Sequence, residues 1–165
     1  MKKVSVLLVL ALAVFALTTM LAYAEGGPTY VGDAKCKGCH KDVHTAWAET
    51  GHAKAFTVLS AEEQKDPKCV SCHITGKDAT GAVLEGVQCE ACHGPGSDYK
   101  SAKIMSKKKW AADPEAQKKM AIEAGLIYPT AENCQSCHKE EGNPNFKPFD
   151  FEKSKAKVHP VKAEG

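Results

Sequence analysis

The chain has 165 residues, with 22 basic side chains, all of them lysines, against 20 acidic ones and a formal net charge of +2. This balance excludes the strongly basic surface that binds nucleic acid, so no nucleic-acid partner is expected. Large apolar residues are sparse after residue 25, and only 7% of residues are aromatic, too little to offset the entropy lost on folding. The composition therefore predicts that something other than side chains fills the interior.

The first 24 residues have the features of a secretory signal peptide. Lys2 and Lys3 precede an apolar run over residues 4–21, and the small-x-small sequence of residues 22–24 matches a cleavage site. Cleavage leaves one domain, residues 25–165, which is expected in the periplasm or outside the cell without membrane attachment. The alternative is an uncleaved membrane anchor, because the apolar run is long for a signal peptide.

Two helices and a loop region are expected in the first half of the domain. Apolar residues four positions apart predict a helix over residues 41–50, with Gly51 as its C-terminal cap. A second short helix is predicted over residues 53–64, before a proline. Residues 74–88 contain three glycines between small and β-branched residues, which predicts a loop or a weak hairpin.

The second half is predicted to continue with two helices and a tail. A lysine-rich helix is expected over residues 99–110. Asp113 and Pro114 are typical of a helix start, and Gly125 marks the end of that helix. Residues 141–165 are rich in proline and charge, which predicts an extended C-terminal tail lying over the body of the protein.

All eight cysteines belong to four Cys-x-x-Cys-His motifs, at residues 36–40, 69–73, 89–93 and 134–138. This is the attachment signature of c-type haem. Two thiols one helical turn apart reach the two vinyl groups on one haem edge, and the histidine that follows binds the iron. The sequence therefore predicts four haem c groups.

The predicted haem ligands follow directly from these motifs. The thioether cysteines are Cys36, Cys39, Cys69, Cys72, Cys89, Cys92, Cys134 and Cys137. The proximal iron ligands are His40, His73, His93 and His138. Disulfides and zinc ribbons are the alternatives for paired cysteines in an exported chain, but neither requires a histidine directly after the second cysteine.

Four haems on one small domain predict both the fold class and the function. The fold is expected to be mainly α-helical, with short helices and long loops wrapped around four closely packed covalent haems. The predicted function is periplasmic electron transfer, as a carrier between respiratory redox proteins whose identity the sequence does not give.

Each iron has a second, distal position, and the candidates for it are His52, His44 and His159. Three histidines cannot serve four irons, so at least one iron uses a methionine such as Met105 or Met120, a lysine, a neighbouring chain, or stays open. His44 follows the proximal His40 by four residues on the same helix face. If His44 is a ligand it therefore serves another haem, and otherwise it is a surface or packing residue.

The chain resembles the tetrahaem cytochrome c-554 family, whose members accept electrons from hydroxylamine oxidoreductase in ammonia oxidisers. The strings that carry the resemblance are residues 35–41 followed by Trp47, and residues 50–55, 69–73 and 86–96. They are specific in order and spacing.

The resemblance covers residues 30–150 and implies haems stacked in near-parallel pairs within a mostly helical chain. It also implies that His52 is the distal ligand of a haem other than the first. The family haem that corresponds to Cys69 and Cys72 lacks a distal ligand.

Two departures from the family concern the distal ligands. Family members have a histidine soon after the Gly-Pro-Gly sequence and another just before the fourth motif, but residues 97–101 and 126–130 contain none. His44 and His159 are additional. The carrier role is therefore expected to transfer better than the ligand set, and the family's electron donor is not carried over.

Two other functions are alternatives. A five-coordinate haem is able to reduce a small nitrogen oxide or peroxide, although the sequence shows no distal acid–base residues for an enzyme. A homo-oligomer or conductive filament, in which a histidine such as His159 binds a haem of the next copy, would supply the missing ligands.

Overall fold

The computed structural model describes residues 26–143 and 145–158, so the predicted signal peptide and His159 lie outside the described residues. The elements are α2 (Asp33–Lys37), α3 (Lys41–Ala48), the 3₁₀ helix η1 (Glu63–Lys65), α4 (Pro67–His73), β1 (Ile74–Lys77), β2 (Val83–Glu85), α5 (Cys89–His93), α6 (Lys107–Ala112), α7 (Pro114–Glu123), α8 (Ala131–Gln135) and α9 (Phe151–Val158). Within these ranges, no helix is long and apolar enough to cross a membrane.

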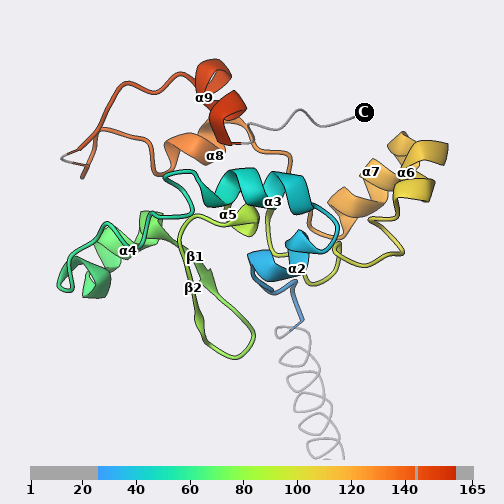
Figure 1. Ribbon diagram of the computed structural model, residues 1–165, viewed down its shortest axis with the longest axis horizontal. Coiled ribbons are helices and arrows are strands. Elements are labelled where there is room, and N and C mark those ends of the chain that lie inside the picture. Colours follow the sequence, from blue (N-terminus) through green and yellow to red (C-terminus); the bar gives the residue numbers. More distant parts are fainter. Residues whose placement is uncertain (1–25, 144, 159–165) are drawn as a thin grey trace, which may run out of the picture.

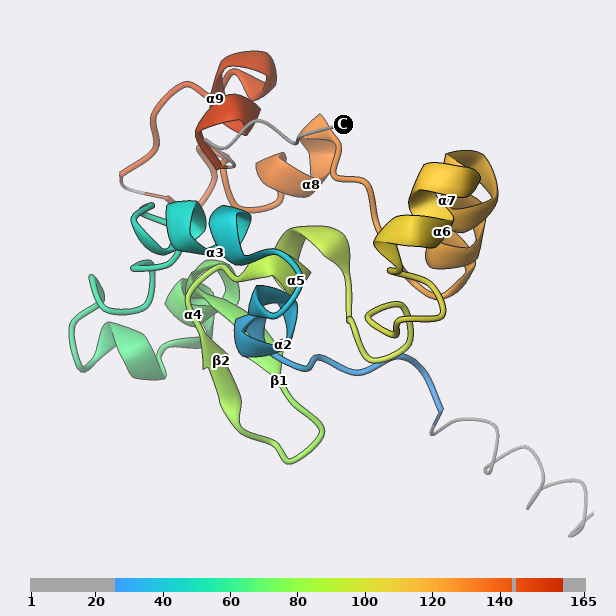
Figure 2. The ribbon, with the colours of Figure 1, turned by 45° about the vertical axis from the view of Figure 1, so that its right-hand side comes forward.

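Short helices joined by long loops surround a central region formed by α3 and α5 (Figure 1). α8 and α9 lie on one side of α3, and α2 and the β1–β2 hairpin lie on the other. α6 and α7 form a pair at one end of the molecule, as the turned view also shows (Figure 2). The prediction of a mainly helical fold with long loops is confirmed.

Each Cys-x-x-Cys-His motif forms a single helical turn. The motifs of α4 and α5 lie entirely within those helices. In the other two motifs, the backbone N–H of the histidine donates to the carbonyl of the first cysteine, from His40 to Cys36 at 3.0 Å and from His138 to Cys134 at 2.9 Å. This i to i+4 bond is the α-helical one, and it brings both thiols to one side of the turn.

Residues 74–88 are predicted to form a loop or a weak hairpin, and the structure has the hairpin. β1 and β2 are antiparallel, with an irregularity in register between Ile74 and Gly76. Asp78 stabilises the connecting turn, since its Oδ1 accepts hydrogen bonds from the backbone N–H groups of Thr80 and Ala82 at 2.8 and 3.0 Å. The hairpin connects the second motif directly to the third.

The predicted helix start at Asp113 is also confirmed. The Asp113 side chain accepts from the backbone N–H of Ala116 at 3.0 Å, with Pro114 in the first turn of α7. Gly125 follows the helix with a φ of 97°, and Leu126 N–H returns to the carbonyl of Ala121 at 2.8 Å. This is a glycine-terminated helix end.

Other predicted elements differ from the structure. The helix predicted for 41–50 ends at Ala48, and Gly51 is not its cap. Residues 53–62 form mainly turns and lead into η1, rather than forming a second α-helix, and the helix predicted for 99–110 begins only at Lys107. Competing side-chain bonds explain part of this, since the Thr50 hydroxyl donates to Trp47 O at 2.7 Å and offers the backbone an alternative to continued helix.

The extended C-terminal tail predicted for residues 141–165 is wrong for residues 151–158, which form α9. Two ion pairs bridge positions three apart, Lys153 with Asp150 at 3.2 Å and Lys155 with Glu152 at 2.5 Å. Spacing of this kind is favourable on a helix. The charges that suggested an extended tail therefore help to form a helix.

The apolar core of side chains is small. Among the described residues, its buried members are Tyr99, Ile104 and Ala121, and they lie against α6 and α7. In the described part of the chain, the other buried apolar side chain is that of Trp47 on α3. The four motifs therefore lie outside the side-chain core, as expected if another group fills the space between them.

Gly86 follows the hairpin and approaches the backbone around His52. Its φ is +78°, and a Cβ here would lie 2.8 Å from the carbonyl oxygen of Ala53. Gly81, in the hairpin turn, has a similar φ of +86° but open space around it. The two glycines separate the effect of backbone strain from that of close approach.

We expect Gly86→Ala to lower the free energy of unfolding by about 2–5 kcal/mol, from the left-handed backbone together with overpacking. Gly81→Ala is the control and should cost only about 1–2 kcal/mol, because the new Cβ strains the left-handed backbone but contacts no other atom. Denaturant unfolding of both variants measures the difference. Equal losses of unfolding free energy in the two variants would contradict the close approach of Gly86 to the backbone of Ala53.

Candidate haem-binding site

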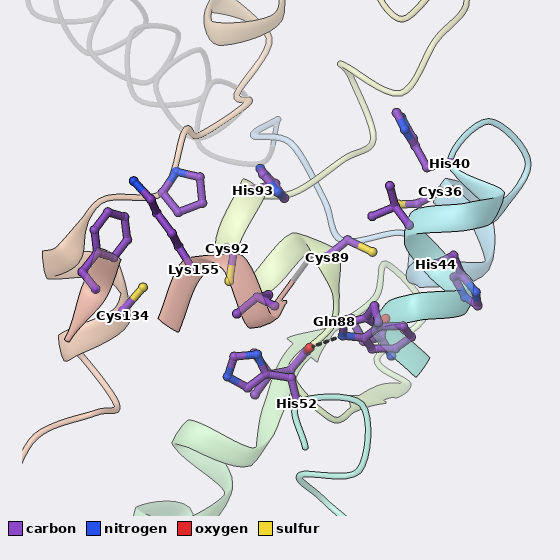
Figure 3. Close-up of a pocket in the computed structure, with 16 residues that line it drawn as sticks. Cys36, His40, His44, His52, Gln88, Cys89, Cys92, His93, Cys134 and Lys155 are labelled. Atoms are coloured by element: carbon purple, nitrogen blue, oxygen red, sulfur yellow. Dashed lines mark hydrogen bonds between the residues drawn. The ribbon is translucent and has the colours of Figure 1, made fainter. Parts of the chain in front are cut away.

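A cavity at the centre of the molecule is lined by cysteines and histidines from three of the four motifs (Figure 3). It lies between α2, α3, α5, α8 and α9. The lining thiols and imidazoles are those of Cys36, Cys89, Cys92, Cys134, His40, His44, His52 and His93, and apolar side chains including Val43, Trp47 and Val87 complete the wall.

The cysteines of different motifs lie in contact with one another. Cys36 and Cys89 line the same cavity, and Cys89 lies close enough to lower the pKa of the Cys36 thiol, which places the first motif beside the third. Burial, and then the nearby Cys134, raise the pKa of Cys92, so the third motif also lies beside the fourth. The motifs therefore follow one another in space in an order that differs from the order in the chain.

The second motif completes this order through Cys72. Burial, and then a hydrogen bond with Cys72, raise the pKa of Cys137 to about 11, which shows that the second motif lies beside the fourth. The spatial order is thus first, third, fourth, second. The structure describes all eight cysteines, and none of them forms a disulfide.

Two of the predicted proximal histidines are oriented by backbone carbonyl groups. The Nδ1 atom of His73 lies 2.5 Å from the carbonyl oxygen of Ala55, and that of His93 lies 3.0 Å from the carbonyl oxygen of Ile127. A carbonyl only accepts hydrogen bonds, so Nδ1 carries the proton in each pair. This tautomer directs the lone pair of Nε2 outward, as in histidines that bind a metal.

His52 lies close to the fourth motif. Its ring centroid is 5.9 Å from that of His138, with the ring planes 55° apart. Burial, and then the nearby His138, lower the pKa of His52 below its usual value. The ring is therefore neutral near pH 7, which is the form that binds a metal.

The chain before α9 supports the same motif. The rings of His138 and Phe149 are stacked, with centroids 4.9 Å apart and planes 13° apart. His138 therefore has Phe149 against its ring as well as His52 nearby. α9 itself contributes Phe151, Lys155 and Val158 to the wall of the cavity.

His44 is held by a carboxylate. Its Nε2 atom lies 2.6 Å from Oδ2 of Asp33, and its ring lies 5.4 Å from that of Trp47. A metal would have to bind Nδ1 or displace Asp33. The structure therefore favours a packing role for His44, while the ligand role stays a prediction.

The two methionines considered as ligands pack against the side-chain core. Met105 and Met120 both contact the cluster around Tyr99, and Nε2 of Gln117 lies 3.6 Å from the sulfur of Met120. Both sulfurs lie in the part of the molecule formed by α6 and α7. This is the common role of a methionine on a helix.

These residues fit haem c. The thiols are arranged in pairs on single helical turns, imidazoles with a defined tautomer follow them, and the cavity wall between the motifs is largely apolar. The side-chain core is too small to occupy this region. The structure thus contains groups of the kinds that would attach haem c and bind its iron.

Sequence reasoning missed several residues of this site. Gln88 and Glu90 hold the chain before the first motif, Phe149 stacks on His138, and Asp33 binds His44. No local pattern marks these residues, because each contact joins positions at least 11 apart, beyond the spacing of a helical turn or a hairpin turn. In the sequence, Glu90 is only an acidic residue between the two cysteines of the third motif, which does not indicate a buried contact.

Comparison with known proteins finds related chains. A family model described as cytochrome c554 and c-prime matches residues 35–94. The curated cytochrome c-554 of Nitrosomonas europaea is 30% identical over 164 residues, covering 81% of this chain and 68% of the relative. The solved structure of reduced cytochrome c554 from Nitrosomonas europaea matches with a TM-score of 0.56 and 25% identity, covering 80% of this chain and 79% of the other.

Proposed function

The chain belongs to the cytochrome c-554 family of c-type cytochromes, which carry electrons on covalently bound haem c, and we propose that it is an exported carrier with four such haems. Bound haem c supplies an iron that is reduced and oxidised by one electron at a time. The observation that carries the proposal is the contact between cysteines of different motifs.

These contacts support a continuous path for electrons. Cys36 lies beside Cys89, Cys92 lies beside Cys134, and Cys137 lies beside Cys72. Each thioether is a short covalent link, so neighbouring attachment points bring neighbouring haem edges close together. The path runs from the first motif through the third and fourth to the second.

The chain's own residues set the iron ligands in this proposal. His40, His73, His93 and His138 are the proximal ligands, and the carbonyl groups of Ala55 and Ile127 fix two of these rings. His52 is the distal ligand of the iron that His138 binds, because its ring is neutral and its centroid lies 5.9 Å from that of His138.

Location and partners rest on the sequence. The signal-like residues 1–24 support export to the periplasm, where c-type cytochromes that serve respiration exchange electrons with other redox proteins. Both partners are redox proteins of unknown identity. The small nitrogen-oxide reductase activity and the filament stay predictions.

His52→Ala tests the ligand assignment. We expect it to convert one haem of the oxidised protein from low spin to high spin, because the iron bound by His138 loses its distal ligand. Low-temperature electron paramagnetic resonance counts the low-spin and high-spin haems. His44→Ala is the matched control, and it should leave the count unchanged because Asp33 holds that ring.

The number of haems is tested by the intact mass of the exported protein. Four added haems are expected, together with reversible reduction of the haem absorbance. A colourless protein whose mass includes no haem would contradict the proposed function. An unchanged spin count in His52→Ala would contradict only the ligand assignment.

A further inference from the structure

Glu90 is a buried acid inside the third motif, between the two thioether cysteines. Its side chain is 1% exposed. Oε2 accepts from the backbone N–H of Gly32 at 2.7 Å, and Oε1 accepts from that of Gly96 at 2.6 Å. The N–H of Val31 lies 3.0 Å from both oxygens.

These partners match the charged form of the side chain. All three are backbone N–H groups, which only donate, and an ionised carboxylate only accepts. Hydrogen bonds of this charge-assisted kind are short and strong. The carboxylate is thus stabilised inside the protein without a basic side chain to neutralise it in the contacts described.

The same contacts connect two motifs. Val31 and Gly32 lead directly into α2, which carries Cys36, and Glu90 is adjacent to Cys89. Gln88 adds a further hydrogen bond between the same two segments, since its Oε1 accepts from the N–H of Asp33 at 2.9 Å. α2 also packs against α5. Glu90 therefore lies where the chain positions the Cys36 and Cys89 thiols against each other.

The turn after the third motif lies directly against the Glu90 carboxylate. A Cβ at Gly96 would lie 2.9 Å from Oε1 of Glu90, so a side chain at this position would have to displace the carboxylate. The hydroxyl of Tyr99 donates to Gly94 O at 2.8 Å and holds the same turn. The close approach makes the position of the charge well defined.

We propose that Glu90 is a positioning residue whose buried negative charge lowers the reduction potential of the haem attached to Cys89 and Cys92. The inference rests on the proposed function, since it needs a haem at the third motif. Reduction adds one electron to that iron, supplied by a chemical reductant in the titration below. A nearby fixed negative charge opposes the added electron, more strongly in a protein interior than in water.

The test is a potentiometric titration of the holo-protein with dithionite as the reductant. In Glu90→Gln, which removes the charge at nearly constant shape, we expect one haem to be reduced more easily. The ratio of its reduced to oxidised form at a fixed potential should rise about tenfold, which is about 59 mV for a one-electron couple. Glu132→Gln is the matched control, because Glu132 is an exposed acid two residues before Cys134.

Glu90→Asp separates the charge from the geometry. It keeps the carboxylate but cannot reach all three N–H groups, so we expect a lower thermal midpoint with wild-type potentials. If Glu90→Gln does not fold, Glu90→Asn decides by comparison with Glu90→Asp, because the two side chains have the same length and differ in charge: easier reduction of one haem in Glu90→Asn supports the proposal, and equal potentials in the two variants overturn it. Four unshifted potentials in folded Glu90→Gln would also overturn it.

Failure of the proposed function gives a different result. A wild-type protein whose peptide containing Cys89 and Cys92 carries no haem mass would remove the premise, whatever the variants do. A wild-type protein with haem at that peptide but potentials insensitive to Glu90→Gln would overturn the role of Glu90 alone.

Discussion

Replacing Cys89 and Cys92 together with alanine is expected to remove one of the four haems and to divide the electron path. The third motif lies between the first and the fourth, through the contacts of Cys36 with Cys89 and of Cys92 with Cys134. Without the haem of the third motif, the haem of the first motif has no neighbouring haem in the spatial order first, third, fourth, second. Intact mass should show three haems, and rapid reduction should show a separate slow phase for the isolated haem.

The matched control is the double variant of the second motif, Cys69→Ala with Cys72→Ala. This motif lies at the end of the proposed order, beside the fourth. The control also loses one haem, but the other three stay neighbours, so the added slow phase is not expected. Equal reduction kinetics in the two double variants would contradict the order of the motifs.

Trp47→Ala is expected to lower the free energy of unfolding by about 3–5 kcal/mol, the usual cost of removing a large buried aromatic side chain. Trp47 is 9% exposed, in a chain with few other buried apolar side chains among the described residues. Its indole N–H donates to the carbonyl of Val87 at 3.0 Å. The side chain therefore joins α3 to the segment that precedes the third motif.

Trp47→Phe is the control for the hydrogen bond. It keeps an aromatic ring in the same place and loses the N–H donor, so a cost of about 1 kcal/mol is expected, the typical net contribution of one such bond. Guanidinium unfolding of the holo-protein measures both variants. If Trp47→Ala costs no more than Trp47→Phe, the packing of this side chain is not what holds the segments together.

Both predictions concern the region between α3 and α5, where the chain has little apolar core of its own. Val87 N–H donates to the carbonyl of His52 at 2.9 Å, and the indole N–H of Trp47 donates to the carbonyl of the same Val87. The segment before the third motif is thus bound to α3 and to the turn that carries His52. A change at any of these contacts is expected to affect haem attachment and distal ligation together.

The sequence by itself determined the cofactor class, and it predicts the attachment residues. The reason is local: a thiol pair and the histidine after it act within one helical turn, so their spacing alone defines the chemistry. The helix start at Asp113 and the hairpin within residues 74–88 were predictable for the same reason, since caps and glycine turns act over a few residues. The resemblance to the cytochrome c-554 family is likewise confirmed.

Only the tertiary structure decided which motifs are neighbours and which side chains support them. Glu90 contacts Val31 across 59 positions, and no sequence pattern connects the two. The pairing of His44 with Asp33 and the stacking of Phe149 on His138 arise in the same way. The C-terminal helix α9 was missed because its charged sequence resembles a solvated tail, whereas the fold gives its apolar side chains a cavity wall to complete. Such contacts depend on how distant segments meet, which local spacing does not encode.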